Sequence, residues 1–304
     1  MYHKSVLLEE SVDALNIGHR RDGVFVDATF GGGGHSREIL KRMGPKGRLI
    51  VFDQDKDALE NIPDDGRITP VRSNFRFLEN HIRYLGVGSV DGIIADLGVS
   101  SHQFDTAERG FSYRFASALD MRMNQSSSLT AADVVSTYDK DQLSRILRDF
   151  GEVDNSAKVA SAILSFRDGA PGKRIETTTQ LSKALEKFYS PQTERKFLGK
   201  VFQALRIEVN QEMRALEDLL TGSSEVLSDG GRLSVITYHS LEDRIVKNFF
   251  RDGKAEGKFE ILSRKPVLPS EEEIASNGRS RSAKLRYGER TRNCQTTQYG
   301  QEKV

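Results

Sequence analysis

A run of four glycines stands shortly after a short apolar segment and precedes a helix-like stretch. Residues 24–26 are Val-Phe-Val, Asp27 follows them, and the glycines occupy positions 31–34. A strand, a glycine turn and a helix in this order bring backbone N–H groups and the positive end of a helix to one place. Because this arrangement suits nucleotide-type ligands, residues 27–36 form the first candidate site in the chain.

Three nucleotide-type ligands are considered for such a turn, and the residues around it separate them. Gly31, Gly33 and Ser36 have the spacing of the dinucleotide motif G-x-G-x-x-G, with serine at its third position. The Gly-Lys-Ser/Thr of a phosphate-binding P-loop does not follow, which excludes that class. Asp27 would face a pyrophosphate badly but suits the positively charged amino-acid end of S-adenosylmethionine (SAM). Asp53 lies 22 residues after Gly31, where an acid can accept hydrogen bonds from ribose hydroxyls. A flexible turn without a ligand is the less favoured alternative.

A carboxylate also ends a later apolar segment. Asp96 follows residues 90–95 and opens the sequence Asp-Leu-Gly-Val-Ser-Ser-His-Gln. Amino-methyltransferases hold the substrate amine at this place with a carboxylate or an amide, but their usual prolines and aromatic residue are absent here. A turn residue that caps backbone N–H groups is therefore the alternative for Asp96. A serine hydrolase is disfavoured, because no G-x-S-x-G elbow accompanies the serines.

The segment after residues 232–237 has the same polar character. His239 is placed to bind substrate or to relay a proton, and the residues do not decide between these roles and a structural one. We expect Ser240 to cap the following helix, with Asp243 three residues on in a capping-box-like arrangement. The histidines and acids here do not cluster at metal-ligand spacing, so no metal is implied.

Short apolar segments must position these groups. The expected strands are residues 24–26, 48–52, 67–71, 90–95 and 232–237, with residues 259–262 and 283–287 as a closing hairpin around a polar loop at 266–282. The expected helices of the first hundred residues are 36–43, 55–61 and 75–85. Strands that alternate with helices of this length indicate an α/β fold with a parallel sheet. Open sheets of this kind bind ligands at the carboxyl edge of the strands.

The strand pattern disappears between residues 105 and 206, where apolar residues recur at helical spacing. We therefore predict a core of residues 1–104 and 207–304 that is interrupted by a helical insert of residues 105–206. Residues 140–206 hold 13 basic and 8 acidic residues, an excess of five positive charges. Residues 279–292 hold six basic residues and one acid.

The composition excludes several classes of protein. The chain has 304 residues and a formal net charge of +1, so it is not a globally basic, histone-like binder. Its single cysteine, Cys294, excludes a disulfide framework and fits a reducing compartment. No apolar run approaches the ~20 residues that span a bilayer, and the first ten residues lack the apolar region of a signal peptide. We expect a soluble, cytoplasmic protein that does not bind membranes.

Seven motifs, in order along the chain, resemble the bacterial ribosomal RNA small subunit methyltransferase H family, also called MraW. They are residues 27–36, 96–101, 108–112, 119–123, 202–207, 230–234 and 239–244. The resemblance runs from His3 to about Arg292. One departure is Lys-Phe-Leu-Gly-Lys-Val at residues 196–201, where the family usually has His-Pro-Ala-Thr-Arg or a similar sequence. This departure concerns the insert and not the SAM site.

The resemblance implies a class I SAM-dependent methyltransferase fold, which is Rossmann-like, with a helical insert. It implies N4-methylation of a cytidine in the decoding region of 16S ribosomal RNA in the small ribosomal subunit, with SAM as the cofactor. The family's SAM contacts fall on Gly33, Gly34, His35, Asp53, Phe75, Asp96 and Gln103, and the residue pattern adds Asp27. Asp96 is also the candidate catalytic residue. From the residues alone, His35 is equally a helix-start residue and Phe75 a core residue.

Two other functions stay open beside this one. The first is an RNA-binding assembly factor that binds SAM without catalysis, against which the intact Asp27, Gly33, Asp53 and Asp96 argue. The second, less favoured, is a nicotinamide-dependent dehydrogenase. The sequence does not determine the oligomeric state and is compatible with a homodimer. We expect the insert and the basic residues 279–292 to contact RNA together, because phosphate contacts need positive charge.

Overall fold

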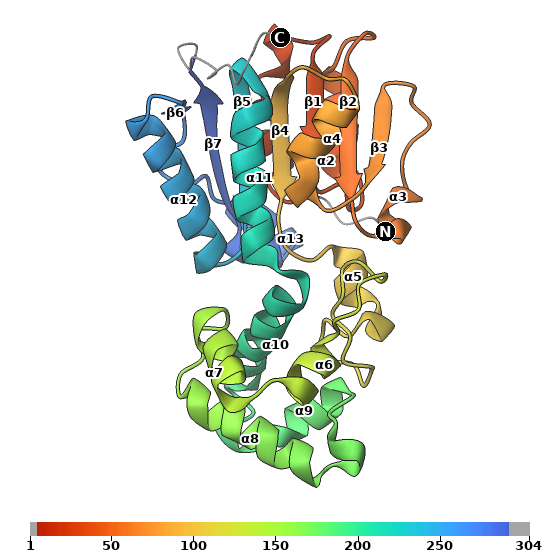
Figure 1. Cartoon of the computed structure of the whole chain (residues 1–304). Coiled ribbons are helices and arrows are strands. Elements are labelled where there is room, and N and C mark those ends of the chain that lie inside the picture. Colours follow the sequence, from red (N-terminus) through yellow and green to blue (C-terminus); the bar gives the residue numbers. More distant parts are fainter. Residues whose placement is uncertain (1–4, 292–304) are drawn as a thin grey trace, which may run out of the picture. The chain divides into compact units, whose positions relative to one another are not determined.

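The computed structural model describes residues 5–291, which form two compact units (Figure 1). One unit contains the chain up to Gly98 and again from Ala215, and the other runs from Val99 to Arg214. The second unit extends further at both ends than the insert of residues 105–206 inferred from periodicity. Among the residues that the structure describes, no helix combines the length and the apolar composition needed to cross a membrane.

The first unit is built on a seven-stranded sheet. Its strands are β1 (Val24–Asp27), β2 (Arg48–Asp53), β3 (Ile68–Arg72), β4 (Val90–Asp96), β5 (Leu227–Thr237), β6 (Phe259–Ile261) and β7 (Lys284–Arg290). Their order across the sheet is β3-β2-β1-β4-β5-β7-β6. Strands β1 to β5 are parallel, whereas β7 runs antiparallel to both β5 and β6. The predicted α/β class, parallel sheet and closing antiparallel pair are confirmed.

Helices cover both faces of this sheet, because alternate residues of each strand point to opposite sides. Phe25 and Leu49 pack with α1 (Leu8–Asp13) and α2 (Gly34–Arg42). Val26 and Ile50 pack with α4 (Leu78–Tyr84), α11 (Glu212–Val226) and α12 (Ser240–Ala255). The shorter elements of this unit are η1 (Ile17–His19), α3 (Lys56–Leu59), η2 (Phe75–Phe77), α13 (Glu271–Ser276) and η6 (Ser280–Ser282).

Two local expectations for this unit differ from the structure. The strand expected at residues 232–237 begins earlier, at Leu227, and β5 contains an irregularity, because Val90 pairs with Leu227 while Gly92 pairs with Arg232. The polar loop at residues 266–282 contains α13 and η6. The first turn of α13 has three glutamates, which the positive end of a helix favours, and this signal was available in the sequence.

The second unit is helical, as the periodicity indicates. Its elements are α5 (Ser101–Asp105), η3 (Ala107–Arg109), α6 (Ala131–Thr137), α7 (Lys140–Asp149), α8 (Ser156–Gly169), η4 (Pro171–Lys173), α9 (Thr178–Ala184), η5 (Glu186–Phe188) and α10 (Glu194–Asn210). Leu143, Ile146, Ile163 and Leu205 belong to one buried cluster that joins α7, α8 and α10. This unit therefore has a hydrophobic core of its own.

Candidate active site

The glycine loop joins β1 to α2 by a tight turn. Gly33 is the N-cap of α2 and has a φ of +73°, a conformation in which a side chain is strained. A Cβ atom at Gly33 would lie 2.7 Å from the ring of Phe30, and one at Gly34 would overlap the hydroxyl of Ser5. At Gly32 a Cβ atom would meet nothing within 4 Å. Packing therefore requires glycine at positions 33 and 34, whereas Gly32 faces open space.

Asp27 lies buried under this loop, with 1% of its surface exposed. Its carboxylate accepts hydrogen bonds from the hydroxyl of Ser36 at 2.6 Å and from the backbone N–H of Thr29 at 3.1 Å. Burial raises the pKa of Asp27, although His35 and Ser36 act in the opposite direction. The charge lies at the N-terminus of α2, where the helix dipole favours an anion. Asp27 thus shapes the glycine loop, and its contact with SAM stays a prediction.

Asp53 ends β2 and faces the same loop. Its Oδ2 accepts a hydrogen bond from the N–H of Gly31 at 2.9 Å, and its Oδ1 accepts one from the N–H of Asp55 at 2.8 Å. Burial raises the pKa of Asp53 to about 6. Each carboxylate oxygen accepts more than one hydrogen bond, so ribose hydroxyls can still donate to this group. Phe75 begins η2 and is partly buried against the core, which leaves both of its predicted roles open.

Asp96 ends β4, which lies next to β1 in the sheet. Its Oδ1 accepts a hydrogen bond from the hydroxyl of Tyr238 at 2.6 Å, and its Oδ2 lies 3.9 Å from Nδ1 of His35. Nε2 of His35 lies 3.1 Å from the carbonyl oxygen of Val6, which assigns the proton of a neutral ring to Nε2. Burial raises the pKa of Asp96 to about 6, although His35 and the Tyr238 hydrogen bond act in the opposite direction.

Tyr238 is the site residue that sequence analysis missed. Asp96 pairs with Ile236 across the parallel strands β4 and β5, so Tyr238 directly follows β5 at the same edge. Burial and the neighbouring Asp96 raise the pKa of Tyr238 well above its usual value, and its hydroxyl therefore keeps the proton that it donates. The sequence carried a signal for this contact, since residues that follow neighbouring parallel strands meet at one edge.

The N-cap of α12 is His239, and the predicted cap at Ser240 is wrong. Nδ1 of His239 accepts from the N–H of Glu242, whose carboxylate in turn accepts from the backbone N–H of His239 at 3.3 Å. An imidazole nitrogen takes the place of the expected hydroxyl as the capping acceptor. Asp243, predicted to complete the box, instead accepts a hydrogen bond from Arg286 at 2.7 Å. These contacts support the structural role of His239.

Gln103 belongs to the second unit and is 5% exposed. Its side-chain oxygen accepts from the N–H of Ser100 at 3.2 Å, and its own N–H donates to the hydroxyl of Ser100 at 3.2 Å. This capping box starts α5 and gives Gln103 a structural role. Its contact with SAM stays a prediction.

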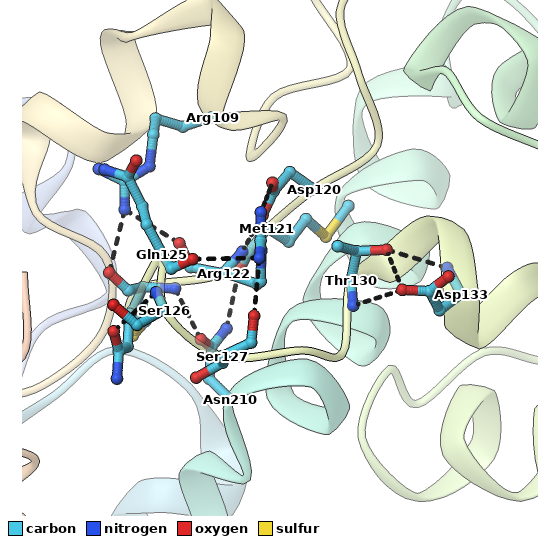
Figure 2. A network of polar contacts seen from close by, with 12 residues as sticks. Arg109, Asp120, Met121, Arg122, Gln125, Ser126, Ser127, Thr130, Asp133 and Asn210 are labelled. Atoms are coloured by element: carbon cyan, nitrogen blue, oxygen red, sulfur yellow. Dashed lines mark hydrogen bonds and ion pairs between the residues drawn. The ribbon is translucent and has the colours of Figure 1, made fainter.

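Side chains from other parts of the second unit hold a strained loop in place (Figure 2). Met121 has a φ of +62°, which is uncommon for a residue other than glycine. The side-chain amide of Asn210 donates to the carbonyl oxygen of Met121 and accepts from the N–H of Met123, both at 2.8 Å. Arg109 donates to the carbonyl oxygens of Arg122 at 2.9 Å and Met123 at 3.0 Å. These side chains therefore fix the backbone of the loop.

The basic residues at 279–292 do not form one exposed surface. Arg290 is 8% exposed and donates to the carbonyl oxygen of Ser224, and Arg286 is 8% exposed and bound to Asp243. Arg279 and Arg281 are exposed, whereas Arg292 lies outside the described residues. The expected RNA contact is therefore wrong for Arg286 and Arg290, because both guanidinium groups are committed to contacts within the protein.

The sheet order, the antiparallel β7 and the acids that end β1, β2 and β4 define a Rossmann-like methyltransferase. The model of the MraW methylase family matches residues 1–291, and the chain belongs to that family. Ribosomal RNA small subunit methyltransferase H of Bacteroides fragilis (strain YCH46) is 54% identical over 301 residues, which cover 95% of this chain and 97% of that protein. The protein of the same name from Christiangramia forsetii is 49% identical and covers 94% of this chain, with 96% of its own length matched. The crystal structure of an rRNA methylase from Streptococcus thermophilus matches 95% of this chain and 99% of its own, with 13% identity and a TM-score of 0.42.

Proposed function

We propose that this protein transfers a methyl group from SAM to the exocyclic N4 of a cytidine in small-subunit 16S ribosomal RNA. The observation that carries the proposal is Asp96, a carboxylate at the carboxyl edge of the sheet whose orientation Tyr238 sets, in a chain of the MraW methylase family. Cytosine N4 is a weak nucleophile, because its lone pair is delocalised into the ring. A fixed acceptor for one N4–H bond favours a pyramidal nitrogen and orients that lone pair.

The residues around the glycine loop fit SAM. Asp53 offers carboxylate oxygens to ribose hydroxyls, and the first turn of α2 offers backbone N–H groups beside Gly33 and Gly34. Phe75 supplies a partly exposed ring for the adenine, and the carboxyl group of Asp27 lies under the loop, bound to the hydroxyl of Ser36. When bound, SAM supplies a methyl group on a positively charged sulfonium.

Replacement of Asp53 tests the cofactor half of the proposal. Asp53→Ala is expected to weaken SAM binding about tenfold or more, because a hydrogen bond to a charged acceptor contributes ~1.5–3 kcal/mol. Isothermal titration calorimetry on the folded variant measures the effect. Asp57→Ala serves as the control, since Asp57 lies in α3 of the same β2–β3 connection and is not assigned to the ribose. An unchanged dissociation constant for Asp53→Ala would show that Asp53 is not the ribose ligand.

The protein's contribution to the reaction is mainly alignment. Effective molarities of ~10⁵–10⁸ M set the scale for well-oriented reacting groups. Asp96 accepts the N4–H hydrogen bond in its ionised form, which predominates above its pKa of about 6. Proton loss from N4 can follow methyl transfer, so the site needs no strong base. The target base must leave any stack, at a cost of a few kcal/mol.

Tyr238 acts through Asp96 and is a positioning residue. Tyr238→Phe removes the hydroxyl that donates to Oδ1 of Asp96 and keeps the ring. We expect kcat at pH 7 to fall about tenfold or more, since a hydrogen bond to a charged group contributes ~1.5–3 kcal/mol, with little change in the KM for SAM. That hydrogen bond lowers the pKa of Asp96, so its loss raises this pKa and moves the acid limb of the kcat–pH profile to higher pH. A merely structural role would change kcat without moving the acid limb.

We assign recognition of the RNA to the unit Val99–Arg214, whose basic excess within residues 140–206 offers phosphate contacts. The exposed Arg279 and Arg281 are proposed to add to it. A cytoplasmic location and a homodimer stay predictions, and sedimentation of the purified chain tests the second of them.

A methyl-transfer assay and calorimetric measurements of cofactor binding together separate the candidate functions. Purified small ribosomal subunits from a strain without the corresponding gene are incubated with the protein and tritium-labelled SAM, and mass spectrometry locates the label. Label on N4 of one cytidine of 16S ribosomal RNA is expected. SAM binding without transfer would support the non-catalytic assembly factor. Binding of a nicotinamide dinucleotide in place of SAM would support the dehydrogenase.

A further inference from the structure

A shallow groove of about 410 Å³ lies wholly within the second unit. Its floor is one face of α8, where Ala157, Ser161 and Ser165 repeat every four residues and so lie in one row. The first residue of α7, Lys140, and the end of η5 complete its walls. None of the residues that line the groove is among the predicted SAM contacts.

Three exposed lysines line this groove, and no acid does. They are Lys140, Lys158 and Lys187. Among residues 5–291, no carboxylate lies within 4.0 Å of any of the three ammonium groups. Lys187 is also held in place, since its Nζ lies 5.5 Å from the centre of the Phe188 ring, which stacks on Phe197. The groove therefore presents positive charge that the protein does not neutralise.

The two serines on the floor are prepared to accept hydrogen bonds. The hydroxyl of Ser161 donates to the carbonyl oxygen of Ala157 at 2.9 Å, and that of Ser165 donates to the carbonyl oxygen of Ser161 at 2.9 Å. Each hydroxyl has one proton, so each oxygen has only acceptor capacity left for a ligand. A ligand that fits must combine negative charge for the lysines with hydroxyl donors for the serines. The ribose-phosphate backbone of RNA has both, whereas DNA lacks the 2′-hydroxyl.

We propose that this groove binds a single-stranded segment of the RNA substrate by its backbone, with phosphates on Lys140, Lys158 and Lys187 and 2′-hydroxyls on Ser161 and Ser165. The groove recognises RNA without reading its bases, and it adds affinity and a preference for RNA over DNA to the reaction at Asp96. This inference rests on the proposed function for the identity of the RNA, but its test does not require methyl transfer.

The test compares two triple variants of the full chain. The groove variant, Lys140→Glu/Lys158→Glu/Lys187→Glu, reverses the charge of the three lysines that line the groove. The control variant, Lys173→Glu/Lys183→Glu/Lys196→Glu, makes the same change of charge at exposed lysines of the same unit outside the groove. Fluorescence anisotropy measures the binding of an oligocytidylate of about ten nucleotides, a length typical for one single-strand site. The groove variant is expected to bind at least tenfold more weakly than the control variant. For the groove variant, the slope of log Kd against the logarithm of the salt concentration should be smaller by about 0.7 for each lost phosphate contact. Equal affinities and equal salt slopes in the two variants would overturn the proposal.

The serines are tested by Ser161→Ala/Ser165→Ala, which suits a helix and keeps the charge. Wild type is expected to bind oligocytidylate more tightly than oligodeoxycytidylate, and the double variant is expected to lose most of this preference. Equal binding of both oligonucleotides by wild type, or polyglutamate binding as tight as RNA binding, would show only a patch for polyanions and contradict the proposal. Normal RNA binding with no methylation of small subunits would instead contradict the proposed function, but it would not contradict RNA binding by the groove.

Discussion

Asp96→Asn is expected to lower kcat for methyl transfer at pH 7.5 by at least about a hundredfold, the scale for losing one preorganised polar contact. Tyr238 donates to Oδ1 of Asp96, so the amide oxygen of asparagine is expected to take that position. The amide NH₂ then replaces Oδ2 and presents a donor to the N4 amino group, which also donates. SAM affinity should change less than about threefold, because the ribose contact is assigned to Asp53. Equal losses in turnover and SAM affinity would assign Asp96 a cofactor role only, and wild-type turnover would remove it from the site.

The same substitution should not destabilise the fold, which separates its effect from unfolding. Burial raises the pKa of Asp96 to about 6 in the folded protein, from an ordinary value of 3.8. The folded state therefore holds this proton more tightly than the unfolded state, and the contribution of Asp96 to stability falls as pH rises through about 6. At pH 7 the free energy of unfolding of Asp96→Asn should equal that of wild type or exceed it by about 1–3 kcal/mol. The range allows for screening by water, because the side chain of Asp96 keeps some solvent contact. The difference should shrink at pH 4. Urea denaturation at both pH values measures it.

Periodicity predicted the elements that position the site because the sheet follows simple patterning rules. The apolar segments before Asp27, Asp53 and Asp96 are buried strands, and all three acids end them. Since parallel strands share their carboxyl edge, the ligand-binding edge followed from the sequence without knowledge of the strand order. The contacts of the glycine loop and of these acids with SAM stay predictions.

The contacts that could not be predicted from the sequence depend on how segments distant in the chain pack against one another. The expected strand at 232–237 ends where β5 ends, so both Tyr238 and His239 follow it, but which of the two side chains reaches Asp96 is set by packing in the folded protein. Ser240 has the better capping side chain by propensity, yet the helix begins one residue earlier and His239 takes the role. Arg290 looked like part of a basic patch, but its place in β7 directs it to the carbonyl oxygen of Ser224. Each of these outcomes is set by a neighbour distant in sequence.

The four glycines of the loop are indistinguishable in sequence, but the structure shows that they are under different steric constraints. Gly33 combines a φ of +73° with a hypothetical Cβ atom 2.7 Å from the buried ring of Phe30. Gly32 lacks both constraints, since its Cβ position is open and its φ is not positive. A comparison of the same substitution at these two adjacent positions therefore isolates the geometry of the loop from the mere loss of a glycine.

Gly33→Ala is expected to lower the free energy of unfolding by about 2–4 kcal/mol, of which the left-handed backbone accounts for ~1–2 kcal/mol and the contact with Phe30 for the rest. The strain is relieved only if the start of α2 shifts, and a displacement of about 1 Å in a site that works by alignment costs about a hundredfold in rate. kcat should therefore fall by about that factor even in the fraction that remains folded, and SAM affinity should fall about tenfold. Gly32→Ala, the matched control, should keep wild-type stability, because its methyl group enters open space. Thermal denaturation, calorimetry with SAM and single-turnover transfer to small ribosomal subunits measure the three quantities. Equal behaviour of the two variants would mean that Gly33 does not set the geometry of the loop at which SAM is proposed to bind.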